Sequence, residues 1–196
     1  MLSAVRLPCS FDASRLERDL AEAESRIAWE RHFNRAYHFG EWSGIALRGN
    51  SNTKLTLSID PSRPDEFADL PLFDACPYVR DVIGAFEAPI RSVRFLKLAP
   101  KAGIKEHRDA FVGFEWDEIR MHVPVLTNDD VDFVVDNERV VMRPGECWYI
   151  DVDKPHSVLN RGTTPRVHLI FDVAMNDWLR EFVASTAAAD QKPGFA

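Results

Sequence analysis

The chain has 196 residues and is poor in several features that define a function class at once. Its three cysteines, Cys9, Cys76 and Cys147, are widely spaced and form no CxxC pair. We therefore expect no disulfide framework, and we expect the thiols to be reduced and the protein to be cytoplasmic. We find no glycine-rich loop that could cradle a phosphate. No apolar run reaches the roughly 18 residues of a membrane-spanning helix, and the first residues lack the apolar stretch of a signal peptide.

Basic charge is also scarce. The 24 Lys and Arg residues are outnumbered by 31 Asp and Glu residues, which gives a net charge of −7 at pH 7. This balance gives no support for nucleic acid or an anionic membrane as a partner. A hydrophobic share of 45% is enough for a full core, and the length favours one domain over residues 1–196.

Strand patterns dominate the second half of the chain. Short apolar stretches alternate with turn residues about every ten positions, which is typical of all-β sandwiches and barrels. The turns include Asn128-Asp129-Asp130 and Pro144-Gly145. Eight strands are predicted, at 92–99, 103–108, 118–126, 131–135, 138–142, 146–151, 156–160 and 165–173. We therefore predict a mainly β fold, a jelly roll with its core at about 91–174.

Helical patterns flank this region. Residues 11–24 carry apolar residues at i, i+4 and i+7 behind Asp12 or Ser14 as a cap, residues 78–86 have helical spacing, and a last helix begins at Asn176. We expect the first and last helices to pack on the sheet, and residues 185–196 to form a flexible tail. Two further strands are predicted around the turn 48–52, one from Trp42 to Leu47 and one from Leu55 to Ile59.

Three polar residues in the strand series form a candidate metal site. His107 and Asp109 are two positions apart, so on a strand they face the same side and can bind the same ion. His156 begins a later strand, and two histidines with one carboxylate suit a non-haem Fe(II) centre with open positions. About half an HxD match is expected by chance in this composition, and a single histidine is more often a core or turn residue. The order of all three along the strands favours the metal site.

Two strands have one apolar side and one charged side. Arg120 and His122 alternate with apolar residues in one strand, and Arg166 and His168 do so in the last. Each arginine alone is more often a surface residue in a salt bridge. In a barrel, however, the charged side can face an internal cavity, and the arginine fork grips a carboxylate through two hydrogen bonds. The pattern indicates a pocket for an acidic co-substrate.

Four segments of the chain together resemble one known family. The segments LAPKAGIKEHRD (98–109), RMHVPV (120–125), RPGECWYIDVDKPHSVLN (143–160) and RVHLIFDV (166–173) are similar to the aspartyl/asparaginyl β-hydroxylase family of Fe(II)- and 2-oxoglutarate-dependent dioxygenases, which includes bacterial free-proline hydroxylases. The segment WSGIALR (42–48) matches more loosely. The resemblance implies a double-stranded β-helix of the cupin type. It also implies that His107, Asp109 and His156 bind Fe(II), that Arg166 binds the distal carboxylate of 2-oxoglutarate, and that Arg120 and His122 contact this co-substrate near the metal.

The implied activity is hydroxylation of a C–H bond of an amino acid, free or in a peptide or carrier-bound precursor. O2 and 2-oxoglutarate would be consumed, and succinate and CO2 released. The animal members that act on EGF-like domains have glycine where this chain has Asp109, so their protein substrate is not carried over. A carboxylate at this position also argues against halogenation, because halide would need its coordination site. Trp42, Arg48 and Arg94 are candidate substrate contacts.

Other functions fit parts of this pattern. The same iron site could desaturate a substrate or close a ring. A cupin-like module that binds a metal or small ligand without oxygenase turnover is the main alternative, although it has no use for two arginines facing one pocket. Nucleic-acid demethylation is disfavoured by the acidic balance of the chain.

Overall fold

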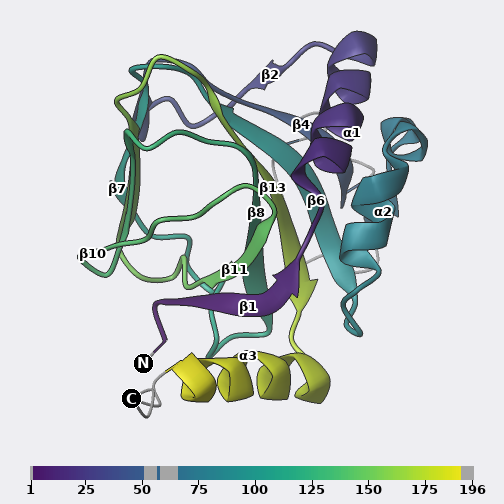
Figure 1. Cartoon of the computed structure of the whole chain (residues 1–196), viewed down its shortest axis with the longest axis vertical. Coiled ribbons are helices and arrows are strands. Elements are labelled where there is room, and N and C mark those ends of the chain that lie inside the picture. Colours follow the sequence, from purple (N-terminus) through teal and green to yellow (C-terminus); the bar gives the residue numbers. More distant parts are fainter. Residues whose placement is uncertain (1, 51–56, 58–65, 191–196) are drawn as a thin grey trace.

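The computed structural model describes residues 2–50, 57 and 66–190 and contains two antiparallel sheets that face each other (Figure 1). The larger sheet has the strand order β1-β11-β8-β13-β6-β4-β2, with β5 paired to β4, and the smaller has the order β10-β9-β12-β7-β3. The strands are β1 (Ala4–Ser10), β2 (Glu30–Arg31), β3 (His38–Phe39), β4 (Trp42–Asn50), β5 (Phe67–Asp69), β6 (Ile90–Leu98), β7 (Gly103–His107), β8 (Glu118–Leu126), β9 (Val131–Val135), β10 (Glu138–Arg139), β11 (Glu146–Ile150), β12 (His156–Asn160) and β13 (Arg166–Ala174). The predicted mainly β jelly roll is confirmed.

The eight strands predicted from residue 92 onward are all present, as β6 to β13. One of them is shorter than predicted: β10 is the edge strand of the smaller sheet and ends at Arg139, not at residue 142. Only Glu138 and Arg139 pair with β9 in the ladder; Val140 adds one amide hydrogen bond to the Phe133 carbonyl, and the side chain of Val141 is 60% exposed. Strand β1 was not predicted. It contains Pro8, which lacks an amide hydrogen and fits an edge strand, and it pairs with β11.

Helices α1 and α3 begin where the sequence places their caps. Helix α1 (Ala13–Arg26) starts after Asp12, whose carboxylate accepts a hydrogen bond from the Arg15 amide, and helix α2 (Pro77–Ile83) follows the 3₁₀-helix η2 (Pro71–Ala75). Helix α3 (Asp177–Asp190) starts after Asn176, whose side chain accepts from the Leu179 amide. Capping by these side chains satisfies amides that have no partner within the helix.

Residues 185–190, the first part of the predicted flexible tail, are helical, because α3 continues to Asp190. Its last turns are rich in alanine, the strongest helix former, and Ala187 is buried in the core. The rest of that predicted tail, 191–196, lies outside the described residues. So does the predicted strand from Leu55 to Ile59, apart from Leu57.

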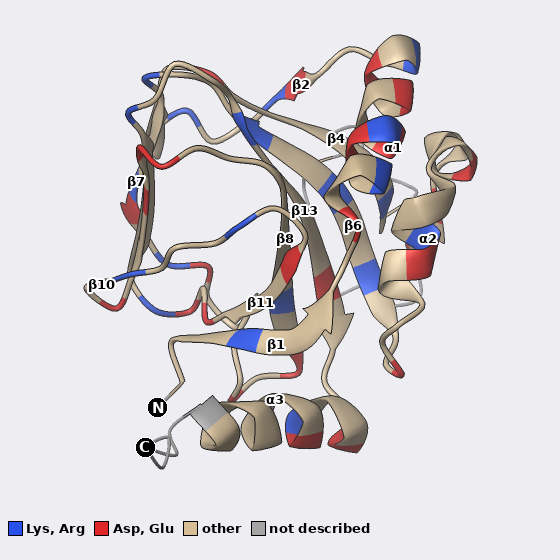
Figure 2. Ribbon diagram, in the orientation of Figure 1, with Lys and Arg blue, Asp and Glu red and all other residues tan. Residues whose placement is uncertain are grey.

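The larger sheet separates two hydrophobic clusters. One lies between this sheet and the three helices, and it includes alternate residues of β8 and β13 such as Met121, Val123, Leu169 and Phe171. The other lies between the two sheets and includes residues such as Leu98, Ile104, Val158 and Ile170. Charged residues also occur on the neighbouring strands β6, β8 and β13 (Figure 2), and Arg94, Arg166 and Asp172 among them are buried. The predicted division of β8 and β13 into an apolar and a polar side is therefore present, with the apolar side against the helices.

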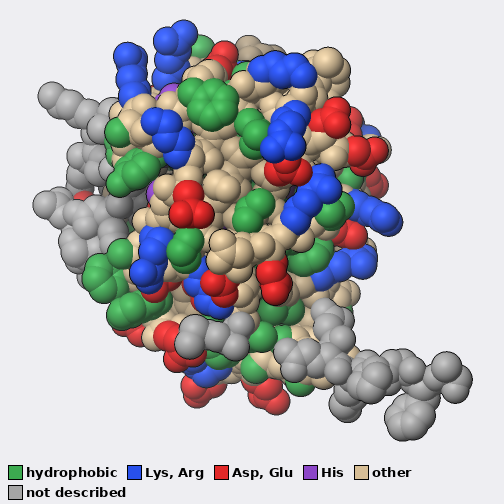
Figure 3. All heavy atoms as spheres, turned by 90° about the vertical axis from the view of Figure 1, so that its left-hand side faces the viewer, with side chains coloured by type: hydrophobic (Ala, Val, Ile, Leu, Met, Phe, Trp, Pro, Cys, Tyr) green, Lys and Arg blue, Asp and Glu red, His purple; other side chains and the backbone are tan. Residues whose placement is uncertain are grey.

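The outer side of the molecule near β7 and β10 carries acidic, basic and hydrophobic side chains interspersed (Figure 3). Among the described helices, none is both long enough and apolar enough to cross a membrane.

Candidate metal centre

A cavity of about 390 Å³ lies between the two sheets, and both sheets contribute to its walls. His107 and His156 line it from the smaller sheet, and Arg94, Arg120 and Arg166 line it from the larger sheet. The predicted polar sides of the strands thus meet at one cavity.

The three candidate metal ligands lie together at this cavity. His156 on β12 is the direct cross-strand neighbour of His107 on β7, and their ring centroids are 4.2 Å apart. Asp109 follows β7, and its backbone amide donates to the carbonyl of Val152 at 2.8 Å. One possible ligand atom of each residue lies within 4.8 Å of the other two. The fold therefore brings together two imidazoles and one carboxylate that are up to 49 positions apart in the sequence.

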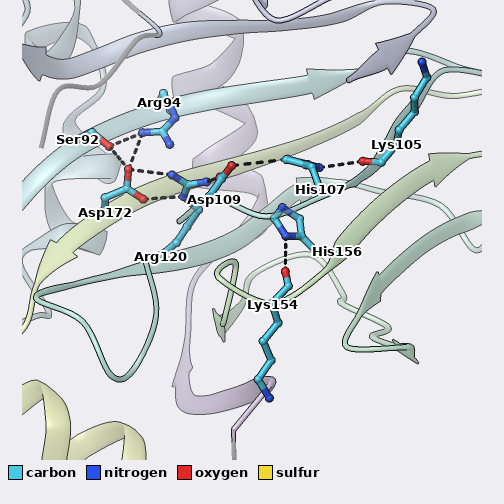
Figure 4. A network of polar contacts seen from close by, with 9 residues as sticks. All are labelled: Ser92, Arg94, Lys105, His107, Asp109, Arg120, Lys154, His156 and Asp172. Carbon is cyan, nitrogen blue, oxygen red and sulfur yellow. Dashed lines mark hydrogen bonds and ion pairs between the residues drawn. The ribbon is translucent and has the colours of Figure 1, made fainter. Parts of the chain in front are cut away.

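Both imidazoles are oriented by the backbone. The Nδ1 atom of His107 donates to the Lys105 carbonyl at 2.8 Å, and that of His156 donates to the Lys154 carbonyl at 3.0 Å (Figure 4). A proton on Nδ1 leaves Nε2 as the lone-pair nitrogen, which is the usual arrangement for a metal-binding histidine. Burial, with the neighbouring His107, lowers the pKa of His156 to about 4, so this ring is neutral at pH 7 as metal binding requires.

Arg166 is a buried cation without a carboxylate partner among the described residues. It is 2% exposed, its Nη2 atom lies 2.7 Å from Nδ1 of His168, and its Nε atom has no partner. Burial lowers the pKa of Arg166 to about 9. Burial, followed by the charge of Arg166, also lowers the pKa values of His168 and His122 well below the usual range. This end of the cavity contains a guanidinium with no compensating charge, which fits an incoming carboxylate.

His122 lies next to this arginine group. Its Nδ1 atom is 3.4 Å from Nδ1 of His168, and its buried Nε2 atom has no hydrogen-bond partner in the described part of the chain. A buried polar atom without a hydrogen bond is costly, so a partner from a bound molecule is expected. The predicted contact of His122 with the co-substrate has support from this free nitrogen but stays a prediction.

Arg120 differs from Arg166 because two carboxylates surround it. Its Nε atom is 2.7 Å from Oδ1 of Asp172, and its Nη1 atom contacts Oδ2 of Asp109 (Figure 4). Burial alone would raise the pKa values of both carboxyl groups, but Arg120 lowers them, with help from Arg94 at Asp172. These carboxylates in turn raise the pKa of Arg120 against its own burial. The predicted contact of Arg120 with the co-substrate stays a prediction.

The three candidate substrate contacts occupy different places. Trp42 lines the cavity with a buried indole nitrogen that has no partner among the described residues, and Arg94 lines it while paired to Asp172. Arg48 was wrongly expected at this site: it pairs with Asp69 at 2.6 Å, outside the cavity wall.

The reason for this error is a register shift in β4. Ala46 is opposite Arg94, but Arg48 is opposite Val93, a residue of the helix-side core. The irregularity moves Arg48 to the other face of the sheet, and simple alternation does not anticipate it.

Two aromatic residues of the cavity wall were missed from the sequence. The His32 ring stacks on Trp42 with ring centroids 3.5 Å apart, and the Tyr37 ring stacks on His107 at 5.4 Å. Both lie between β2 and β4, in a segment without strand or helix periodicity. Asp172 was also missed, although it continues the alternation of Arg166 and His168 along β13.

Comparison with known protein families agrees with this geometry. A family described as "Aspartyl/Asparaginyl beta-hydroxylase" matches residues 14–175, which is most of the chain and includes every candidate site residue.

Two curated relatives are amino-acid hydroxylases by name. The chain is 28% identical over 169 residues to L-proline cis-4-hydroxylase of Rhizobium meliloti (strain 1021), covering 83% of this chain and 57% of that protein. It is 27% identical over 200 residues to L-proline cis-3-hydroxylase 1 of a Streptomyces species, covering 95% of this chain and 61% of that protein. The chain thus spans about three fifths of the length of these relatives.

A solved structure supports the fold. An oxidoreductase of the 2OG-Fe(II) oxygenase family from Burkholderia pseudomallei matches with a TM-score of 0.57 and 16% identity, over 88% of this chain and 85% of that one. At this identity the similarity concerns the fold alone, and it agrees with the jelly roll described above.

Proposed function

The chain belongs to the aspartyl/asparaginyl β-hydroxylase family, and on that basis we propose that it is an Fe(II)- and 2-oxoglutarate-dependent dioxygenase. The proposed reaction hydroxylates a C–H bond of an amino acid, free or in a peptide or carrier-bound precursor. One observation carries the proposal: two imidazoles, a carboxylate and an uncompensated buried guanidinium open onto the same cavity. The names of the two proline hydroxylases support an amino acid as the substrate.

His107, Asp109 and His156 would hold the ferrous ion through two nitrogens and one oxygen. Such a ligand set leaves coordination positions open for a chelating co-substrate and O2. When bound there, the ion supplies the redox chemistry by which 2-oxoglutarate and O2 become succinate and CO2, with one oxygen atom inserted into the substrate C–H bond.

Arg166 would orient the co-substrate by pairing with its distal carboxylate. The guanidinium is fixed by its contact with His168 and retains N–H groups for two charge-assisted hydrogen bonds. Apolar residues around the cavity, including Leu96, Ile104 and Ile170, exclude water and so strengthen this pairing.

The substrate would bind along the wall formed by His32 and Trp42. The buried indole nitrogen of Trp42 has no acceptor among the residues that the structure describes, so an acceptor oxygen of the substrate is its natural partner. We also propose a cytoplasmic location, since Cys9, Cys76 and Cys147 are all unpaired.

The test loads the protein anaerobically with Fe(II), ascorbate and 2-oxoglutarate and then admits O2 with a panel of amino acids and small peptides. We expect succinate, together with a substrate that gains one oxygen atom by mass spectrometry. His107→Ala should abolish both products. A substrate that loses two hydrogens would indicate desaturation or ring formation.

A second measurement separates an enzyme from a binding module. We expect N-oxalylglycine, a close analogue of 2-oxoglutarate, to raise the melting temperature of the Mn(II)-loaded protein. If it does so while no substrate in the panel promotes succinate formation, the cupin-like binding module is favoured. If it has no effect, the co-substrate site proposed here is wrong.

A further inference from the structure

A row of buried and partly buried polar side chains crosses three adjacent strands behind the metal centre. Asp172 on β13 is the direct cross-strand neighbour of Ser92 on β6 and of Arg120 on β8. The Asp172 carboxylate is completely buried, accepts from the Ser92 hydroxyl at 2.7 Å and pairs with Arg94 at 3.0 Å. Figure 4 shows that these contacts lead through Arg120 to Asp109.

Arg120 connects the row to the candidate metal ligand. Its Nε and Nη2 atoms face the two oxygens of Asp172 at 2.7 and 3.4 Å, so one edge of the guanidinium is fixed. The Nη1 atom is then directed at Oδ2 of Asp109. The planar guanidinium holds its N–H groups in fixed directions, so fixing one edge also fixes the other.

The two oxygens of Asp109 consequently have different surroundings. Oδ2 contacts Arg120, whereas Oδ1 lies 3.7 Å from Nε2 of His107, on the side of the candidate ligand cluster. Only Oδ1 is free of a cationic partner and close to the imidazoles.

We propose that Asp172 is a positioning residue that acts through Arg120 and makes Asp109 a metal ligand through one oxygen only. This inference rests on the proposed function, because it requires Asp109 to bind the metal. A carboxylate that bound through both oxygens would occupy a further coordination position. Holding Oδ2 on Arg120 keeps that position available to the co-substrate.

Stability alone does not explain why the chain contains this row. Arg94, Arg120, Asp109 and Asp172 form two cations and two anions, so the group is balanced in charge. Buried ion pairs are weak contributors to stability, and apolar residues of similar volume often replace them without loss. Apolar residues could not, however, make the directional contact by which Arg120 holds Asp109.

The proposal predicts that two substitutions in one row change metal affinity in opposite directions. Asp172→Asn removes the charge that holds the other edge of Arg120, so Arg120 pairs with Asp109 alone and competes more strongly with the metal. Arg120→Met removes the competitor and its positive charge, so both oxygens of Asp109 become available. A purely structural role predicts that both substitutions weaken metal binding.

The probe is Mn(II), whose free form is measured by electron paramagnetic resonance in the absence of O2 and co-substrate. We expect Asp172→Asn to weaken Mn(II) binding by about 10- to 100-fold, the usual range for a residue behind a metal ligand. Arg120→Met should strengthen it by at least about threefold, as expected from the loss of a nearby like charge. The double variant should bind Mn(II) as Arg120→Met does, because Asp172 acts only through Arg120.

A control variant tests for a general effect of a lost buried carboxylate. Asp19 on α1 is also buried and accepts from the Val79 amide, but it lies in the helix layer. Asp19→Asn should leave Mn(II) affinity within about twofold of the wild-type value, since it is not connected to the row. Circular dichroism identifies any variant that does not fold, and the charge-balanced double variant provides the test if a single one is lost.

N-oxalylglycine provides the second readout. On the Mn(II)-loaded Arg120→Met variant its affinity should fall by at least about 10-fold, because the second oxygen of Asp109 then occupies a position that the chelator needs.

The outcomes separate this inference from the proposed function. If the wild-type protein does not bind Mn(II), or if its Mn(II) affinity equals that of His107→Ala, the metal centre itself is refuted. If the wild type binds Mn(II) through His107 but Asp172→Asn and Arg120→Met both weaken binding, or Asp172→Asn has no effect, only the positioning role of Asp172 is refuted.

Discussion

Two buried arginines face the same cavity from neighbouring strands, yet their surroundings are opposite. Arg120 on β8 has two carboxylate partners, whereas Arg166 on β13 has a neutral imidazole as its partner among the described residues. Arg166 is 2% exposed and the Arg120 side chain 14% exposed, and of the two only Arg120 has a compensating charge within the described chain. The difference indicates that Arg120 pairs with the protein's own carboxylates, whereas Arg166 is available to a carboxylate of a ligand.

The largest expected effect of this difference concerns stability. Arg120→Met should lower the free energy of unfolding of the metal-free protein by about 3–5 kcal/mol, because the buried Asp172 keeps only Arg94 and the partly exposed Asp109 loses the guanidinium that it contacts. Arg166→Met should cost less than about 1 kcal/mol or stabilise the protein, because it removes an uncompensated charge. Urea unfolding of both variants checks this, and equal losses would contradict the comparison.

The groups around Arg166 and those around Arg120 should also lose their contributions to the free energy of unfolding in different pH ranges. The pKa values of His122 and His168 lie well below the usual 6.5, so below pH 6.5 the unfolded chain binds protons that the folded chain does not. The free energy of unfolding should therefore fall by up to about 1.4 kcal/mol per pH unit for each of them. The lowered pKa of Asp172 stabilises the fold above pH 3.8, and this contribution is lost only as pH falls further.

Urea unfolding of the metal-free protein between pH 7 and 3 measures both ranges. His168→Asn should give a shallower decline between pH 6.5 and 5, whereas Asp172→Asn should change the dependence only below about pH 4. If the decline is unchanged in His168→Asn, the pKa of His168 is not lowered in the folded protein.

Ligand binding gives the next effect. Arg166→Met should weaken binding of N-oxalylglycine to the Mn(II)-loaded protein by at least about 100-fold, because a charged pair with two hydrogen bonds is lost. Isothermal titration calorimetry measures this affinity. Metal affinity should change little, which distinguishes this variant from His107→Ala, and a retained N-oxalylglycine affinity would place the carboxylate elsewhere.

The smallest effect is expected outside the cavity. Arg48→Gln removes a partly exposed ion pair with Asp69, which is typically worth less than about 1 kcal/mol. Substrate conversion should be unchanged, because Arg48 faces away from the cavity. A selective loss of activity with normal unfolding would return Arg48 to the substrate site.

Much of this arrangement could be predicted from the sequence because strand alternation has a strict period. Arg120 and Arg166 interrupt apolar strands at alternate positions, so their side of the sheet follows directly. The alternation also includes Asp172, but a single strand does not show which residue is its cross-strand neighbour. The different surroundings of the two arginines therefore became visible only with the register of three strands.

The remaining features depend on irregular structure. The register shift before Arg48 has no counterpart in the apolar pattern of β4. His32 and Tyr37 reach the cavity from a segment without periodicity, and their positions depend on stacking with Trp42 and His107. Such contacts join residues that are distant in sequence, so no local pattern reports them.

The origin of the site residues has a mechanical consequence for the two-sheet fold. His107 and His156 are on the smaller sheet, whereas Arg166 is on the larger one. A dicarboxylate bound by both the ion and the guanidinium would span the space between the two sheets and connect them through strong polar contacts. Co-substrate binding would then slow amide hydrogen exchange in both layers together, while the ion alone would protect mainly the layer that carries the histidines.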